Sequence, residues 1–223
     1  MMRSATKSDH VASLPPEVWL NIFSHFDYFD LKIAALVSKG FKTLSEHRTF
    51  GGVTFRHVAP LAAGANLDPD KVIIHPALER MSYGCTDDIH DATMISYKDD
   101  GDFKNSPLIE TSAIDEYATM PALKVVKIKV QRAEPFTLEN ENGVTVRQVL
   151  QGFVDFFGRT GRRTLYDVHP WLKDIVNPKY REENRLATYR DFMGDHTVWN
   201  GSFDGQELDK DGTLLFHKIF FDS

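Results

Sequence analysis

The stretch from Ser13 to Leu44 constrains this chain most, because its apolar residues recur at helical spacing and are too numerous for one small helical unit to bury. Its first part carries a wide apolar stripe that consists of Val18, Trp19, Ile22, Phe23 and Phe26. Pro15 and Pro16 precede the stripe and predict a helix start, since proline is tolerated in a first helical turn. The stretch therefore predicts a helical docking module with apolar surface left for a partner.

A second helix is predicted to open at Leu31 with Asp30 as its N-cap, because a carboxylate there accepts a bond from an orphan amide and faces the positive dipole end. Val37, Phe41 and Leu44 form a second apolar stripe, with Gly40 weakening the helix between them. The module is expected to span residues 13–50 and to follow a disordered tail at residues 1–12.

The order of residues within this module matches a known motif. The matching positions are Leu14-Pro15, Glu17-Val18, Ile22-Phe23, Asp30-Leu31 and Val37-Ser38-Lys39 followed by Phe41. In this order they resemble an F-box, the short helical motif by which substrate receptors attach to the Skp-type adaptor of cullin-RING ubiquitin ligases. Phe26 stands where that family usually shows leucine, which is a tolerable apolar exchange.

The resemblance implies which side chains contact the adaptor. They are Leu14, Pro15, Ile22, Phe23, Leu31, Val37, Ser38 and Phe41. The alternative interpretation is a helical hairpin packed on its own domain, since helical periodicity alone is common.

The remaining sequence is long enough for one further domain. The chain has 223 residues, of which 42% are hydrophobic, so a domain of about 150 residues can bury its own core. Residues 51–71 are rich in glycine, alanine and turn formers and are expected to be a linker with one short strand at Val53–Phe55. The second domain is expected at residues 72–223, and its first third, up to Tyr117, as long loops with few regular elements.

This second domain is predicted to be α+β, with an antiparallel sheet and helices on one face. Thr145 and Gln148 fit a capping box that opens an apolar helix, and Gly158 is expected to end this helix in a left-handed cap. A second helix is expected from Asn177 to about Met193. The predicted strands are Leu123–Val130, Phe136–Glu139, His196–Trp199 and Thr213–Phe221.

Three segments of the C-terminal part also resemble a family. Ala118–Leu123, Gly143–Leu150 and Tyr189–Gly201 are similar to successive blocks of a domain that is widespread in fungal proteins and has no established function. The resemblance implies a fungal origin and does not imply an activity.

Composition limits the compartment and the partners. Without a signal peptide or a long apolar run, and with Cys85 as its single cysteine, the chain is expected to be intracellular, in the cytoplasm or nucleus. The formal net charge of −6 argues against nucleic-acid binding, which normally needs a basic face. No membrane partner is expected.

Four candidate chemical sites fail tests of spacing. Glu207–Gly212 resembles half of an EF-hand loop but has Lys218 where a bidentate glutamate is required. Asp87–Asp91 has no partner ligands elsewhere, and Cys85 has no histidine at a supporting spacing. Gly158–Arg163 could cradle a phosphate, for instance of a phosphorylated client, but lacks the end of a P-loop, so a solvated basic loop is preferred. Catalytic, metal and cofactor sites are therefore not expected.

These observations predict a non-catalytic substrate receptor of a ubiquitin ligase. Its partners would be the Skp-type adaptor, cullin through that adaptor, and a protein client that the sequence does not identify. The client would bind the second domain, so that tethering raises its effective concentration near the ligase. The alternative is an adaptor-bound scaffold or titrator without a client, and a hydrolase or transferase is a third and poorly supported interpretation.

Overall fold

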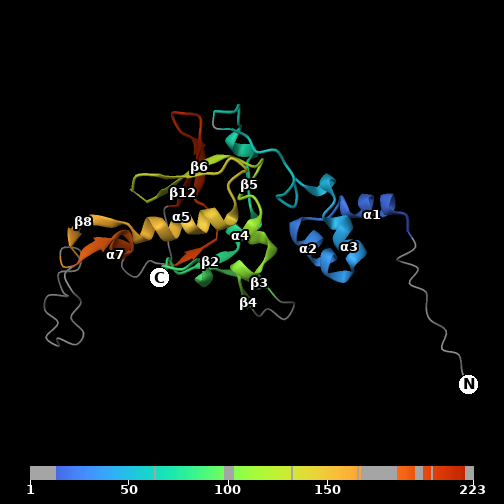
Figure 1. Cartoon of the computed structure of the whole chain (residues 1–223), viewed down its shortest axis with the longest axis horizontal. Helices are drawn as coiled ribbons and strands as arrows, with labels where there is room; N and C mark the ends of the chain where they lie inside the picture. Colours follow the sequence, from blue (N-terminus) through green and yellow to red (C-terminus); the bar gives the residue numbers. More distant parts are fainter. Residues whose placement is uncertain are drawn as a thin grey trace, which may run out of the picture. The chain divides into compact units, whose positions relative to one another are not determined.

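A computed structural model of the chain describes residues 14–62, 64–97, 103–131, 133–164, 166, 185–193, 198–201 and 203–218. The chain folds as two compact units, Met1–His57 and Val58–Ser223 (Figure 1). The boundary lies inside the segment expected as a linker. The ring of Phe55 packs edge-on against Tyr28 within the first unit, whereas Leu61 forms a bridge with Leu123 within the second. The segment is thus divided between the two units.

The described part of the first unit is helical. It consists of α1 (Pro16–Phe23), α2 (Tyr28–Val37), α3 (Lys39–Ser45) and the 3-10 turn η2 (Arg48–Phe50). The predicted start of the first helix next to Pro15 is confirmed. The buried centre consists of Phe23, Leu31, Ala34 and Phe50.

The predicted N-cap of the second helix is wrong by three residues. Helix α2 begins at Tyr28, and its N-cap is Asp27, whose Oδ1 accepts from the Asp30 backbone N–H at 2.8 Å. Asp30 Oδ2 accepts from the Asp27 N–H at 3.2 Å. Asp30 is therefore the third helical residue of a reciprocal capping box, which satisfies two orphan donors instead of one.

The expected continuous second stripe is also interrupted. Ser38 has extended backbone angles (φ −161°, ψ 163°), so it ends α2 and caps α3 by accepting from the Phe41 N–H at 3.1 Å. The break at Ser38 turns Phe41 toward α1, where its ring lies 4.6 Å from Trp19. The strand expected at Val53–Phe55 is a series of turns, in which Phe55 has a positive φ of 55°.

The second unit is α+β, as predicted. One sheet has the order β11–β12–β6–β7, with bounds Gly205–Leu208, Leu214–Lys218, Val125–Val130 and Phe136–Glu139. The predicted hairpin of β6 and β7 is confirmed. However, β12 pairs with β6 in parallel, so this sheet is mixed where an antiparallel one was expected. As expected of an interior strand, β12 is buried on both faces.

A second sheet was not anticipated. Its order is β10–β2–β3–β4, with bounds Trp199–Asn200, Met81–Tyr83, Thr93–Tyr97 and Phe103–Pro107. The expectation of long loops before Tyr117 is therefore wrong. This part also holds β1 (Ile73–Ile74), α4 (Pro76–Glu79) and four 3-10 turns: η3 (Pro69–Lys71), η4 (Ile89–Asp91), η5 (Leu108–Glu110) and η6 (Ser112–Asp115). Strand β1 pairs with β5 (Thr119–Met120). Strands of two to five residues are too short for a clear alternating pattern.

Helix α5 (Val146–Gly158) begins as predicted. Thr145 Oγ1 accepts from the Gln148 N–H at 3.4 Å, and Gln148 Oε1 accepts from the Thr145 N–H at 3.0 Å. The predicted left-handed cap at Gly158 is wrong, because Gly158 is the last helical residue and Arg159 leaves the helix in an extended conformation (φ −65°, ψ 133°). The chain then continues directly into β8 (Thr160–Thr164).

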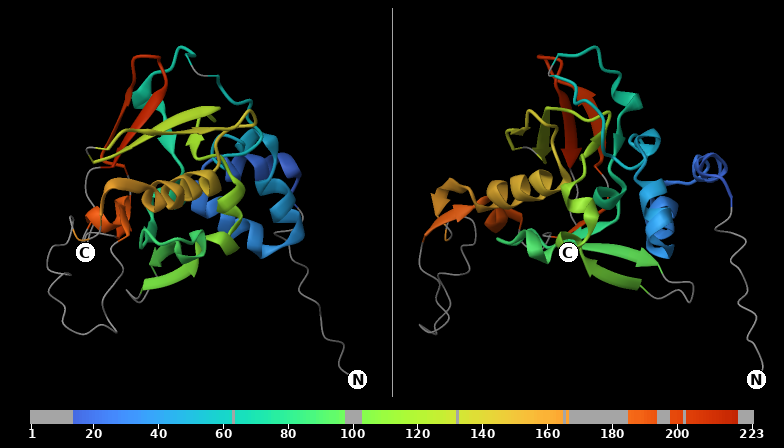
Figure 2. Two further views of the ribbon diagram at one scale, coloured as in Figure 1. Left: turned by 60° about the vertical axis from the view of Figure 1, so that its left-hand side comes forward. Right: turned by 45° about the vertical axis from the view of Figure 1, so that its right-hand side comes forward.

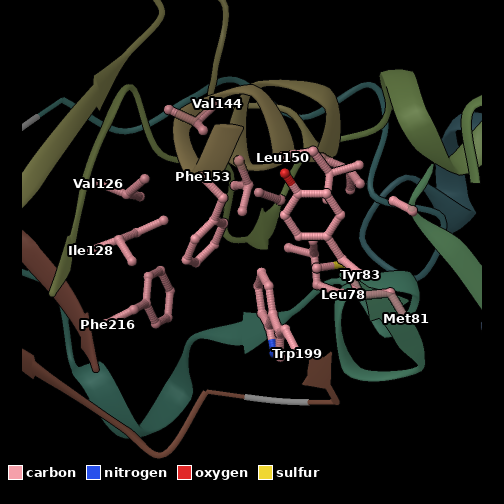
Figure 3. Packing of buried hydrophobic residues seen from close by; sticks show 14 of the residues in the cluster. Leu78, Met81, Tyr83, Val126, Ile128, Val144, Leu150, Phe153, Trp199 and Phe216 are labelled. Atoms are coloured by element: carbon pink, nitrogen blue, oxygen red, sulfur yellow. The ribbon is translucent and has the colours of Figure 1, made fainter. Parts of the chain in front are cut away.

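The core of the second unit surrounds α5, which lies between the β6 sheet and the β2 sheet in all three views of Figures 1 and 2. Phe153 points from the helix toward both sheets (Figure 3). Its ring lies 5.5 Å from that of Phe136 on β7 and 4.4 Å from that of Trp199 on β10. Gly152 lets the helix approach β7, since a Cβ there would lie 2.7 Å from a methyl carbon of Leu138.

The second long helix expected from Asn177 to Met193 is not supported in its described part. Residues 177–184 lie outside the described ranges, whereas Leu186–Thr188 is strand β9 and only Tyr189–Met193 is helical, as α7. Strand β9 pairs with β8. Half of the strand expected at His196–Trp199, and residues 219–221 of the last one, also fall outside the described ranges. In the part of the chain that is described, no helix has the length and apolar character needed to cross a membrane.

Replacing Phe153 with alanine should destabilise the second unit by about 3–5 kcal/mol, because this fully buried ring contacts both sheets and would leave a cavity. Denaturant unfolding measures the change. The control is Gln151→Ala on the exposed side of the same helix, which should stay within about 0.5 kcal/mol of the parent. Equal midpoints for the Phe153 variant and the parent would contradict the assigned core.

Candidate docking surface of the first unit

Two of the eight side chains predicted to contact an adaptor lie in the core of the first unit. Phe23 and Leu31 are each only 1% exposed. The ring of Phe23 stacks on Phe26 at 5.1 Å and meets Phe41 edge-on at 5.4 Å. In this structure Phe23 and Leu31 have no surface to offer a partner, and they hold the helices together instead.

The other six predicted residues retain accessible surface. Leu14 and Pro15, which lead into α1, are exposed, with Leu14 at 41%. Val37 is 67% exposed at the end of α2, and Ser38 follows it on the surface. Ile22 and Phe41 are half-buried. The predicted set thus combines side chains that support the helices with side chains that a partner can reach.

Helix α2 presents a second apolar face that the sequence interpretation missed. Ile33 is 63% exposed and Leu36 is 87% exposed, and together with Val37 they occupy positions i, i+3 and i+4 of one helix face, here called the α2 strip. Tyr28, Leu31 and Ala34 are buried on the opposite face. A helix that is apolar around its whole circumference is normally covered on all sides. The signal was present in the sequence YFDLKIAALV, which has only Asp30 and Lys32 as charged residues.

The side chains considered as a nucleophile or as metal ligands are buried or are bound by neighbouring groups of the protein. Burial raises the pKa of Cys85 to about 12, so its thiol is protonated at neutral pH. Asp209 forms an ion pair with Lys127 and accepts from the Thr213 N–H at 2.9 Å, within the turn between β11 and β12. Asp88 accepts from the His90 N–H at 2.9 Å. Among the described residues, no three histidine, cysteine, aspartate or glutamate side chains are grouped to hold a metal ion.

Comparison with known proteins identifies the first unit. A protein-family model, the F-box domain, matches residues 12–51. The chain therefore carries an F-box domain, as the order of its residues predicted. No curated protein and no solved structure matches the chain. The resemblance of the C-terminal part to a fungal domain is not confirmed by these comparisons and stays a prediction.

Ser38 offers a test that separates its structural role from a contact role. Replacing Ser38 with alanine removes the cap of α3 and should cost about 1 kcal/mol of local stability, whereas Ser38→Asp keeps an acceptor at the N-cap and should cost much less. Amide hydrogen exchange of α3 measures both variants. If alanine and aspartate weaken α3 equally, the capping role is refuted.

Proposed function

We propose that this protein is an F-box substrate receptor that docks on the Skp-type adaptor of a ubiquitin ligase through its first unit. The observation that carries the proposal is the α2 strip within the F-box domain, where Leu36 and Val37 are 87% and 67% exposed. Contiguous apolar side chains of this kind mark surfaces that bind another protein.

The proposed contact surface keeps the accessible members of the predicted set and adds the two further residues of the α2 strip. It consists of Leu14, Pro15, Ile22, Ile33, Leu36, Val37, Ser38 and Phe41. Phe23 and Leu31 support this surface from the core. The proposed recognition is apolar, because the strip itself carries no charged side chain.

The second unit is proposed to capture a protein client, while cullin joins through the adaptor. Tethering would raise the effective concentration of the client near the ubiquitin-loaded enzyme, so bond formation would take place on another subunit. The protein itself would be non-catalytic and would act in the cytoplasm or nucleus. The second unit has its own buried core around α5, and surface loops on such a core commonly carry binding residues, which supports this division.

Two double variants should abolish adaptor capture by the full-length protein. Leu14→Ala with Pro15→Ala removes the entry to α1, and Ile33→Ala with Leu36→Ala removes most of the α2 strip while retaining a good helix former. Each buried apolar side chain contributes about 1.5–3 kcal/mol, so the loss of two should weaken binding by roughly a hundredfold or more. Binding to purified adaptor by calorimetry measures the effect.

The matched control is Val53→Ala, which truncates an apolar side chain of the same unit that is 40% exposed and lies outside the proposed surface. It should bind like the parent. Circular dichroism should show that all variants keep their helices. Parent-like adaptor binding by both double variants would refute the proposed surface.

Co-purification separates the receptor from a titrator. A receptor should bring adaptor, cullin and a client, and the Ile33/Leu36 double variant should lose adaptor and cullin but keep the client, because the client is proposed to bind the other unit. A titrator should bring adaptor alone. Recovery of adaptor without cullin or client from the parent protein would therefore favour the titrator.

A further inference from the structure

The second unit contains an open pocket of about 520 Å³ whose walls carry two arginines. The pocket is bounded by the end of α5, by β8, by β9 and α7, and by the loop before η4. Strand β8 is paired with β9, and α7 directly follows β9, so these three elements lie side by side (Figure 1). The lining residues are Asp87, Gly158, Thr160, Arg185, Leu186, Thr188, Arg190 and Asp191.

One of the two arginines, Arg185, is held in a structural ion pair within the pocket wall. Arg185 donates two bonds to Asp191, Nη1 to Oδ2 at 2.7 Å and Nη2 to Oδ1 at 2.9 Å. Asp191 also accepts from the backbone N–H and hydroxyl of Thr188. Burial opposes ionisation of Asp191, but the bonds from Arg185 and Thr188 outweigh it and lower its pKa to about 2. This pair is a fixed wall of the pocket.

The other arginine is held by a partner that lies almost entirely in solvent. The Nη2 atom of Arg190 lies 2.7 Å from Oδ1 of Asp87, whose side chain is 82% exposed, whereas that of Arg190 is 29% exposed. The Nε atom of Arg190 is buried and makes no hydrogen bond within the described residues. A partly buried guanidinium with an unpaired buried donor favours an anion that can supply a further acceptor.

The surroundings of the pocket favour an anion as well. Arg159, Arg162 and Arg163 are exposed and adjoin the lining residues Gly158 and Thr160 in the sequence. This corner thus gathers arginines in a chain whose net charge is −6. The carbonyl end of α5 at Gly158 opposes an anion, and the cation of Arg159 immediately after it offsets that effect.

We propose that this pocket binds the phosphate or carboxylate group of an acidic client segment, which displaces Asp87 from Arg190. Asp87 then acts as an internal competitor for the guanidinium. A phosphate group has the advantage, because it presents several acceptor oxygens and up to two negative charges to the planar donor fork of arginine. The identity of the ligand as part of a client rests on the proposed function, whereas anion binding by the pocket does not.

The test is a titration of the full-length protein with inorganic phosphate at constant ionic strength, followed by backbone amide chemical shifts. Saturable binding is expected, with shifts confined to β8, β9, α7 and the loop at Asp87. Asp87→Asn should tighten binding at least threefold, because it removes the competing charge from an exposed position. Arg190→Gln should weaken binding at least tenfold, and Arg190→Lys should also weaken it, because it keeps the charge but loses the fork.

The matched control is Arg147→Gln, which removes a similar surface arginine of the same unit. Arg147 Nη2 lies 2.9 Å from Asp115 Oδ1, and the aspartate side chain is 72% exposed, but neither residue lines the pocket. This variant should bind phosphate like the parent. The proposed site would be overturned if Asp87→Asn left the affinity for phosphate unchanged, or if the Arg147 and Arg190 variants lost equal affinity. If the Arg190 variants fail to fold, the result for Asp87→Asn alone tests the site.

Two synthetic peptides of glycine and alanine distinguish the sources of the anion, one with a single phosphoserine and one with glutamate in its place. The phosphoserine peptide should compete with inorganic phosphate and bind more tightly than the glutamate peptide. If free phosphate binds and neither peptide competes, the pocket takes a free anion and its assignment to a client is overturned. Adaptor capture by the first unit is independent of all these results, so failure here is distinguishable from failure of the proposed function.

Discussion

The packing of α5 between two sheets is the interaction on which the second unit depends. Neither sheet has a helix of comparable length in the described residues, so the apolar face of α5 serves both of them. Phe153 bridges Phe136 on one side and Trp199 on the other, although these residues lie far apart in the sequence. Met81 and Tyr83 of β2 belong to the same buried cluster as the apolar face of α5, so burial against this helix stabilises that strand.

The first unit uses its apolar residues in two ways. On α2, one face closes the small core through Leu31 and Ala34, while the α2 strip on the other face stays in solvent. A unit of fewer than 60 residues has too little volume to cover both faces of such a helix. The excess of apolar residues that first marked this stretch therefore has a physical basis in the structure.

Sequence patterns predicted the elements whose signals are local. The capping box at Thr145 and Gln148 and the β6–β7 hairpin depend on neighbouring residues, and both were found. The predicted N-cap of α2 was wrong because Asp30 alone was considered. Asp27 and Asp30 cap each other, and this reciprocal pair places the start of the helix at Tyr28. The parallel pairing of β12 with β6 and the contact of Trp199 with Phe153 arise from contacts between distant segments, which no local pattern encodes. The predicted contact residues and the proposed docking surface overlap only in part for a similar reason, because burial of Leu31 and exposure of Leu36 are decided by how three helices pack.

Two ion pairs of the second unit show why exposure, rather than charge, separates a binding site from a structural contact. His75 and Glu116 are paired at 3.0 Å with almost no exposed surface on either side chain, and His75 Nδ1 also accepts from the Ala77 N–H. A ligand could reach them only after the core opened, so this pair serves the fold. In the Arg190 pair the aspartate already lies in solvent, and its displacement returns it to water at little cost. An ion pair whose anion is exposed and whose cation is only partly buried can therefore exchange its anion without unfolding.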